Sequence, residues 1–324
     1  MDPVSVGRSG LRVSRLCLGT MIFGSQLDEA KAFAVMDRGV ELGIDFFDTA
    51  DVYPVPPAPD TWGRTEEIVG RWLRSRGAPI TLATKCVARV GPGANDLGGS
   101  RKHVIEACEA SLRRLHLERI DLYYLHNSDL GAPMEETLEA LDRLVQDGKV
   151  HYVGVSNFDA WQLGLAMSLA AERRLARIAI VQPRYNLLNR TYERELLPLC
   201  RAAGIGLAPY NPLGAGMLTG KYRRGDEPPA DSRFGLGNYG RMYQQRYWSD
   251  RMFDVVETVT AVGQDVGASA AAVAVAWLLA QPDVTSPIVG ASHPEQLDDS
   301  LRALEVRLSR EHLDRLGEVS QPFV

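Results

Sequence analysis

Four titratable side chains follow the ends of three apolar segments in the first half of the chain. Asp48 closes the run "IDFFD", Lys85 closes "ITLATK" and His126 closes "IDLYYLH". Tyr53 lies five residues after Asp48. Each residue alone is compatible with a structural role, such as a cap, a solvated lysine, a core histidine or a packed phenol. Their joint occurrence after three successive apolar runs indicates a catalytic site.

These residue types suit the transfer of a proton to a carbonyl oxygen. A lysine ammonium beside a phenol stabilises the phenolate and lowers the tyrosine pKa, while a carboxylate keeps the lysine charged and oriented. We therefore expect Tyr53 to donate a proton near neutral pH and His126 to hold the oxygen by a hydrogen bond. A donor of this kind needs a hydride source. The six histidines show neither HxH nor HExxH spacing, so we expect no metal site.

Short apolar segments alternate with helix-length segments along nearly the whole chain. Because the short segments are apolar almost throughout, they predict strands of a parallel sheet that is buried on both faces. Helix ends are recognisable between them: segments 28–43 and 65–77 end at glycines, Ser100 can cap 100–116, and Pro133 begins 133–148. The eight predicted strands are residues 14–19, 44–48, 80–85, 120–126, 151–156, 178–182, 205–210 and 285–290.

Eight strand–helix units predict an α/β fold, a single (β/α)8 barrel that occupies residues 1–324. An open doubly wound sheet is the alternative, but "SRLCLGTMIFG" lacks its Gly-rich first turn. We expect an N-terminal hairpin that turns at residues 7–10 and caps the barrel. Residues 211–249 are expected to form a long loop over the barrel mouth. Because active sites lie at the carboxyl ends of barrel strands, the four titratable residues should converge on one rim.

The composition narrows the class of protein. Of 324 residues, 45% are hydrophobic and 24% charged, as in globular proteins, and the net charge of -5 argues against a nucleic-acid-binding surface. No apolar run approaches the roughly 18 residues of a membrane helix, and the N-terminus lacks the apolar core of a signal peptide. The four cysteines form no CxxC pair. We therefore expect a cytoplasmic protein with reduced thiols and no membrane insertion.

A series of longer motifs resembles the aldo-keto reductase superfamily. They occur in the family's order over nearly the whole chain, and the resemblance is greatest to the branch with the potassium-channel β subunits and the bacterial Tas-like reductases. The motifs are "GIDFFDTADVY", "LATK", "IDLYYLH", "GVSNF", "VQPRYNLLNR", "APYNPLGAGMLTGKY" and "GASHPEQLDDSL". The resemblance implies a (β/α)8 barrel that reduces aldehydes or ketones to alcohols with NADP(H) as cofactor.

The same resemblance implies roles for individual residues. Tyr53 would be the general acid, Asp48 and Lys85 its tuning pair, and His126 the substrate-orienting group. Residues 211–216 would wrap the pyrophosphate, and Tyr210 would stack on the nicotinamide ring. The implied cofactor-binding residues are Gly19, Thr20, Met21, Asp48, Ser156, Asn157, Gln182, Tyr210, Asn211, Pro212, Leu213, Gly214, Gly216, Lys221, Arg233, Gly290, Ser292, Gln296, Asp299 and Ser300. Asp299 and Ser300 stand where the family pattern has Glu and Asn.

Two other functions fit parts of the sequence. One is a regulatory or scaffold subunit that binds NADP(H) with little turnover, although all four proton-handling residues are present. The other makes Lys85 a Schiff-base lysine, which Asp48 and Tyr53 suit poorly. Phe23 and Trp62 suggest a pocket for hydrophobic carbonyl compounds, with the proline-rich residues 54–63 as a stiff, extended wall. The physiological substrate and a homo-oligomeric state are left open.

Overall fold

The computed structural model describes residues 1–129 and 131–324, and its centre is an eight-stranded parallel sheet. The sheet order is β10-β3-β4-β5-β6-β7-β8-β9. Single parallel bridges, Tyr210 to Ile288 and Leu207 to Val284, join its two edges and close the barrel. The predicted (β/α)8 fold is confirmed. The strands are Cys17–Gly19 (β3), Phe46–Asp48 (β4), Thr81–Cys86 (β5), Ile120–Leu125 (β6), Val150–Ser156 (β7), Ile178–Gln182 (β8), Gly206–Leu207 (β9) and Ile288–Val289 (β10).

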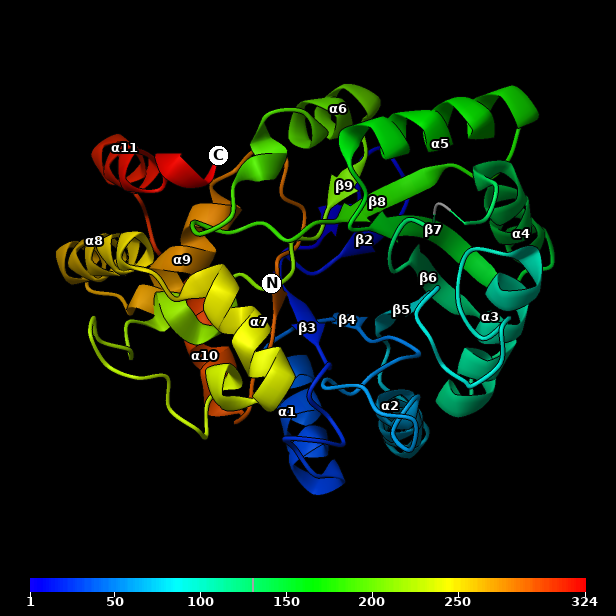
Figure 1. Ribbon diagram of the computed structural model, residues 1–324, viewed down its shortest axis with the longest axis horizontal. Helices are drawn as coiled ribbons and strands as arrows, with labels where there is room; N and C mark the ends of the chain where they lie inside the picture. Colours follow the sequence, from blue (N-terminus) through cyan, green and yellow to red (C-terminus); the bar gives the residue numbers. More distant parts are fainter. Residues whose placement is uncertain (130) are drawn as a thin grey trace.

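Helices surround the sheet, with α1 to α6 following one another around it and α8 to α11 completing the circle (Figure 1). Ser100 caps α3 as predicted, because its side chain accepts a hydrogen bond from the backbone of His103. Among the described residues no single helix is long and apolar enough to cross a membrane. The helices are Glu29–Glu41 (α1), Arg64–Arg76 (α2), Arg101–Leu115 (α3), Met134–Gln146 (α4), Ala160–Arg173 (α5), Leu196–Ala203 (α6), Gly237–Tyr247 (α7), Asp250–Val266 (α8), Ala270–Leu279 (α9), Glu295–Arg302 (α10) and Arg310–Val319 (α11).

Alternate side chains of each strand point to opposite faces of the sheet, which explains why the strands are apolar throughout. Leu18 and Phe47 pack outward against helices, whereas their neighbours Cys17 and Phe46 pack inside the barrel. The interior cluster also contains Val6 and Val13 from the N-terminal hairpin. The predicted hairpin therefore closes one end of the barrel, and the opposite end carries the carboxyl ends of the strands.

The hairpin pairs Val4–Ser5 (β1) with Arg12–Val13 (β2), and its turn needs a glycine. Gly7 has φ +54, and a Cβ at this position would lie 2.3 Å from the carbonyl oxygen of Gly204. The next residue, Arg8, donates its backbone N–H to that same oxygen at 2.7 Å. The close approach ties the hairpin to the end of α6 and fixes it under the barrel.

Residues 211–249 are more regular than we expected from their many glycines and tyrosines. They contain two 3-10 turns, Gly214–Thr219 and Arg233–Gly235, followed by the 11-residue helix α7. The sequence of α7 has little preference for a helix, so tertiary contacts must stabilise it. Tyr243 and Tyr247 are buried, and the Tyr247 hydroxyl accepts a hydrogen bond from Asn211 at 3.0 Å. The prediction of an irregular loop was wrong for this helix.

Candidate active site

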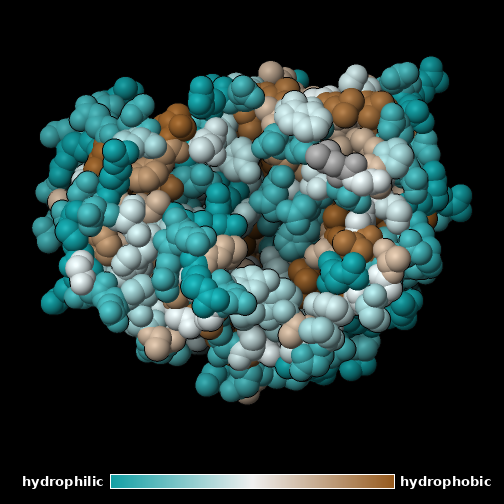
Figure 2. Space-filling model, in the orientation of Figure 1, coloured by the Kyte–Doolittle hydropathy of each residue, from teal (hydrophilic) through white to brown (hydrophobic). Residues whose placement is uncertain are grey.

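The strand register brings the predicted catalytic residues to one rim. Gly19, Asp48 and Ala83 are neighbours across β3, β4 and β5, which places Asp48 and Lys85 at the carboxyl ends of adjacent strands. His126 directly follows β6, and its backbone N–H donates to Cys86 at 3.0 Å. Figure 2 shows a hollow near the middle of the molecule in this view. All four candidates therefore belong to one side of the barrel mouth.

Lys85 is the centre of this group and is fully buried. Its ammonium donates to the Asp48 carboxylate at 2.5 Å and to the Thr49 carbonyl at 2.7 Å. It also lies 3.5 Å from the Tyr53 hydroxyl. We call Asp48, Lys85 and Tyr53 the triad. Water reaches it poorly, because Asp48 and Tyr53 are only 3% and 8% exposed. These contacts therefore connect the Asp48 carboxylate, the Lys85 ammonium and the Tyr53 phenol in one network.

Lys85 stays protonated in the triad, and its positive charge acts on the two other groups. Burial by itself lowers the pKa of Lys85, but Asp48 and Tyr53 raise it above its usual value, so the ammonium form persists. Burial raises the pKa of Tyr53, and Lys85 opposes this only in part. Lys85 acts to lower the Tyr53 pKa as predicted, but desolvation outweighs the ammonium, so the pKa lies above its ordinary value. Tyr53 keeps its proton at neutral pH.

His126 lies beside Tyr53 as a neutral imidazole. The ring centroids are 5.8 Å apart and nearly perpendicular, so that one ring presents its edge to the other. Burial, followed by the positive charge of Lys85, lowers the pKa of His126 to about 3. Its Nδ1 is buried without a hydrogen-bond partner in the described part of the chain. A neutral imidazole at this place can donate one hydrogen bond to an oxygen brought to Tyr53.

A second set of polar side chains continues the rim along β6 to β9. Gln182 donates from Nε2 to Asp48 at 2.8 Å, which links this set to the triad. Ser156 donates to the Gln182 carbonyl at 2.8 Å, and Asn157 donates to the His126 carbonyl at 3.0 Å. The Tyr210 hydroxyl completes the set by donating to Asn157 at 2.8 Å. Sequence reasoning placed these residues at strand ends, but it missed the bond from Gln182 to Asp48.

The match to known families agrees with this geometry. The model of the "Aldo/keto reductase family" matches residues 15–321. The chain belongs to the aldo/keto reductase family. It is therefore an oxidoreductase of a family that generally uses NAD(P)H.

Curated relatives of this aldo/keto reductase are similar over nearly their whole length. It is 38% identical to a probable voltage-gated potassium channel subunit beta of Oryza sativa subsp. japonica, over 99% of this chain and 97% of the relative. Protein Tas of Escherichia coli strain K12 is 35% identical, over 98% and 97% respectively. An L-glyceraldehyde 3-phosphate reductase of Escherichia coli O157:H7 is 36% identical, over 96% and 90%.

The segment after β9 is a tight glycine-rich turn. Asn211, Gly214, Ala215 and Gly216 all have positive φ, between 54° and 95°. The N–H groups of this turn donate within it, Gly214 to the Asn211 carbonyl at 3.1 Å and Gly216 to the Leu213 carbonyl at 3.0 Å. Ala215 adopts a positive φ although it carries a Cβ, and Asn211 stabilises it by accepting the Ala215 N–H on its side chain at 2.7 Å. Pro212 and Leu213 complete the turn.

Two cations, Lys221 and Arg233, lie near this turn. Neither has a carboxylate partner among the described residues, 1–129 and 131–324. The Lys221 ammonium lies over the Tyr222 ring, 5.0 Å from its centroid, and the Arg233 guanidinium lies 5.9 Å from the Tyr243 ring. A Cβ at Gly216 would approach the Lys221 Nζ to 3.7 Å, which places the ammonium beside the turn. Unpaired cations beside a glycine-rich turn suit the phosphates of a nicotinamide dinucleotide.

The remaining predicted cofactor residues divide into two groups. Gly19 and Thr20 border Asp48, since Thr20 donates from its hydroxyl to the Asp48 carbonyl at 2.9 Å, and Met21 packs near Tyr53. The others, around the start of α10, are already engaged within the protein. Ser292 bonds to Gln296, Asp299 accepts from Ser269, and the buried Ser300 donates to the Gln296 carbonyl. Gly290 differs, because a Cβ added to it would meet only the Gly19 carbonyl oxygen, at 4.0 Å. This leaves room for a ligand beside Gly290.

The two aromatic residues predicted near the substrate differ in position. Phe23 follows the carboxyl end of β3 but is fully buried in the hydrophobic core, so it does not line an open pocket. Trp62 is half-buried and packs against the cluster that contains Tyr53. Residues 59–63 form a turn, in which the backbone N–H groups of Thr61 and Trp62 donate to the Ala58 carbonyl at 2.9 and 3.2 Å. The prediction of an extended wall was wrong for this half of the segment, because local hydrogen bonds fold residues 58–62 back. The stiffness of residues 54–63 stays a prediction.

Proposed function

We propose that this aldo/keto reductase reduces aldehydes or ketones to alcohols with NADP(H) as cofactor and Tyr53 as proton donor. The observation that carries the proposal is the buried triad, in which Lys85 contacts both Asp48 and Tyr53, with the neutral His126 ring next to Tyr53. The cofactor, when bound, supplies a hydride to the carbonyl carbon. Tyr53 gives its proton to the carbonyl oxygen as negative charge develops there, and His126 holds that oxygen.

The charge of Lys85 has a definite part in this proton transfer. Its ammonium lies 3.5 Å from the Tyr53 oxygen and stabilises the phenolate that remains after the proton has left. Asp48 keeps the lysine charged, and Gln182 holds Asp48 from its other oxygen. The low exposure of the triad strengthens these interactions relative to water. Ser156, Asn157 and Tyr210 continue the same rim and would orient the nicotinamide.

An NADPH oxidation assay with a panel of carbonyl compounds tests the proposal. The panel contains an aryl aldehyde, a sugar aldehyde, a quinone and a ketosteroid. We expect absorbance of NADPH to fall with at least one of them and the corresponding alcohol to form in equal amount. If the protein binds NADPH but reduces none of these compounds, the regulatory alternative replaces the reductase proposal. That alternative draws support from the relative named as a potassium channel subunit beta.

Replacing Lys221 with Ala is expected to weaken binding of the dinucleotide. Lys221 is exposed, lies beside the turn at Gly216 and has no carboxylate partner in the described parts of the chain. Loss of one ammonium–phosphate contact corresponds to about a 10- to 100-fold increase in KM for NADPH. We expect kcat to stay close to that of the wild type and KM for NADH to rise by a similar factor, since Lys221 lies beside the turn proposed to hold the pyrophosphate, which both dinucleotides carry.

Arg223→Ala is the matched control for this variant. Arg223 is also exposed and lies two residues further along the same segment. It should leave KM for NADPH nearly unchanged, because only a cation beside the turn contacts the phosphates. An equal rise in KM for both variants would show a general charge effect and would contradict the assignment of Lys221.

A further inference from the structure

Arg184 lies just beyond the carboxyl end of β8 and is half-buried. From Ile180 onward, alternate residues of this strand face the interior of the barrel: Ile180 belongs to the interior cluster, and Gln182 donates to Asp48. Tyr185, on the opposite face, packs in the cluster between the sheet and the helices. Arg184 is therefore the next inward-facing residue after Gln182, and its side chain lies at the barrel mouth.

Three phenols lie close to the Arg184 side chain. The backbone of Arg184 forms a parallel bridge with that of Tyr210, whose hydroxyl donates to Asn157 at 2.8 Å. Burial raises the pKa of Tyr210, Tyr247 and Tyr192, and the positive charge of Arg184 opposes this rise in all three. The guanidinium therefore lies on the β8 and β9 side of the mouth, close to helix α7, which carries Tyr247.

Arg184 has no partner for its charge in the described parts of the chain, residues 1–129 and 131–324. No carboxylate there lies within ion-pair distance of its guanidinium, and none of its side-chain N–H groups has a hydrogen-bond acceptor there. Two other half-buried arginines are paired: Arg190 contacts Glu193, and Arg114 contacts the buried Glu66, both at 2.7 Å. A guanidinium that has lost part of its hydration without gaining an acceptor is suited to bind an anion.

A second cation adds to the positive potential at this place. Arg246 of α7 is exposed, has no carboxylate within ion-pair distance among the described residues, and also opposes the rise in the pKa of Tyr210 and Tyr247. The carboxylate whose charge acts on Tyr192 is Asp159, which is engaged in the capping box at the start of α5. Two guanidinium groups and one engaged carboxylate leave a net positive charge beside these phenols.

The position of Arg184 decides which anion fits. It lies beside Tyr210, which together with Asn157 is proposed to orient the nicotinamide, whereas Lys221 lies beside the turn proposed to hold the pyrophosphate. The nicotinamide end of the dinucleotide carries an amide and no phosphate, so it offers Arg184 no anion. A carbonyl compound that receives a hydride must lie against the nicotinamide ring, and a carboxylate or phosphate attached to that compound can reach the guanidinium.

We propose that Arg184 holds the anionic group of a substrate that carries a carboxylate or phosphate in addition to its aldehyde or ketone. This role of Arg184 rests on the proposed reductase function and defines the substrate class of that site. The planar guanidinium can hold either group through two parallel N–H donors. Because the anionic group takes no part in the bond changes at the carbonyl, Arg184 contributes to substrate binding and acts on KM more than on kcat.

A kinetic comparison of anionic aldehydes with their neutral esters tests this role. The acids are 4-oxobutanoate and 4-formylbenzoate, each compared with its methyl ester in the presence of NADPH. We expect KM of at least one acid to be about 10- to 100-fold below that of its ester, the range for one charge-assisted contact. Arg184→Gln should remove this difference, and Arg184→Lys, which keeps the charge but not the planar fork, should keep part of it. The melting temperature of both variants should stay near that of the wild type, because neither loses an ion pair.

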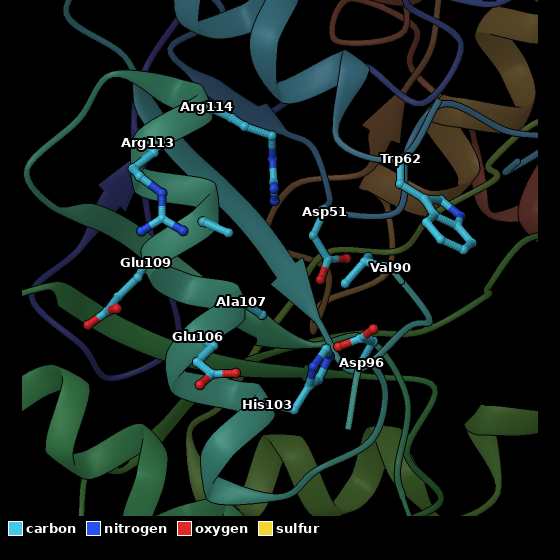
Figure 3. A pocket seen from close by; sticks show the side chains of 11 residues that line it. Asp51, Trp62, Val90, Asp96, His103, Glu106, Ala107, Glu109, Arg113 and Arg114 are labelled. Atoms are coloured by element: carbon cyan, nitrogen blue, oxygen red, sulfur yellow. The ribbon is translucent and has the colours of Figure 1, made fainter. Parts of the chain in front are cut away.

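Arg113→Gln is the matched control for Arg184→Gln. Arg113 is exposed, has no carboxylate within ion-pair distance among the described residues, and lines a separate cavity of about 360 Å³ between α3 and the loop after β5 (Figure 3). This variant should keep the full preference for the acid over its ester. An equal loss of the preference in both variants would show that net charge, and not the position of Arg184, causes it, and would overturn the assignment.

Calorimetry distinguishes failure of this assignment from failure of the reductase proposal. The ligands are 4-(hydroxymethyl)benzoate and its methyl ester, titrated into the NADP⁺ complex of the wild type and of Arg184→Gln. We expect the acid to bind the wild type about 10- to 100-fold more tightly than the ester, and the variant to lose this advantage. If neither aldehyde pair is reduced but this pattern holds, only the reductase proposal fails. The assignment is overturned if no acid is preferred in either measurement or if Arg184→Gln keeps the preference. It is also overturned if Arg184→Gln weakens binding of NADPH by the same factor, because the guanidinium would then belong to the pyrophosphate.

Discussion

Tyr53→Phe is expected to lower kcat for carbonyl reduction by about 10²- to 10⁴-fold, the usual contribution of a positioned general acid. The substitution removes the Tyr53 hydroxyl, which lies 3.5 Å from the Lys85 ammonium, and leaves the ring that packs against His126. The affinity for NADPH, measured by fluorescence titration, should stay nearly unchanged, because the proposed cofactor contacts lie elsewhere on the rim. Loss of turnover with retained binding would identify an interaction needed only in the transition state.

Tyr243→Phe is the matched control for this experiment. Tyr243 is the other phenol close enough to Tyr53 to influence its pKa, but it has no contact with Lys85. It should keep most of the wild-type turnover. Wild-type kcat in Tyr53→Phe, or an equal loss in both variants, would show that Tyr53 is not the acid.

The pKa shifts also make the pH dependence of Tyr53 testable in the same assay. Reduction needs protonated Tyr53, and its pKa is raised above the ordinary value of about 10, so activity limited by proton donation should hold until the pH is strongly alkaline. His126 has a pKa of about 3 and remains neutral over the whole working range. The kcat profile should therefore lack an inflection near the usual histidine pKa of about 6.5.

The sequence predicted the positions of the strands and of the titratable residues well, for a physical reason. Strands buried on both faces are apolar over most of their length, so a charged residue after the apolar run marks the carboxyl end, as Asp48 and His126 show, although Asp121 lies near the start of β6. In a closed parallel barrel all such ends meet on one rim, and local pattern is enough to assemble the triad. The motif order that resembles the family then placed Ser156, Asn157 and Tyr210 on the same rim.

What the sequence did not predict depends on contacts between distant segments. Gln182 and Asp48 are 134 residues apart, and their bond follows from the curvature of the sheet. The raised pKa of Tyr53 reflects how much desolvation outweighs Lys85, which is a property of packing. Helix α7 is stabilised by the burial of Tyr243 and Tyr247 and could not be found from helix propensity.

Lys85→Met is expected to abolish measurable turnover and also to destabilise the protein by about 3–5 kcal/mol, the range for breaking a buried ion pair. The ammonium is fully buried and bonded to Asp48, so its loss leaves a carboxylate without a charge partner. The pKa of Tyr53 should rise further without Lys85, which makes it a weaker acid. Chemical denaturation and the NADPH assay measure the two effects separately.

The pH dependence of this destabilisation has a definite sign. Burial already raises the pKa of Asp48, and removal of Lys85 takes away the main opposing influence. A carboxyl whose folded-state pKa lies above its unfolded value binds a proton more readily when folded, so its penalty is small in acid and grows as the pH rises through the folded-state pKa. Lys85→Met should therefore differ less from the wild type in acid than at neutral pH.

The double variant Asp48→Asn with Lys85→Met separates stability from catalysis. Removing both charges leaves no unpaired ion in the core, so most of the lost stability should return. Turnover should stay as low as in Lys85→Met, because the ammonium that stabilises the Tyr53 phenolate is still absent. Recovery of turnover along with stability would mean that Lys85 only supports the fold, and Tyr53 would then act without the pair assigned to tune it.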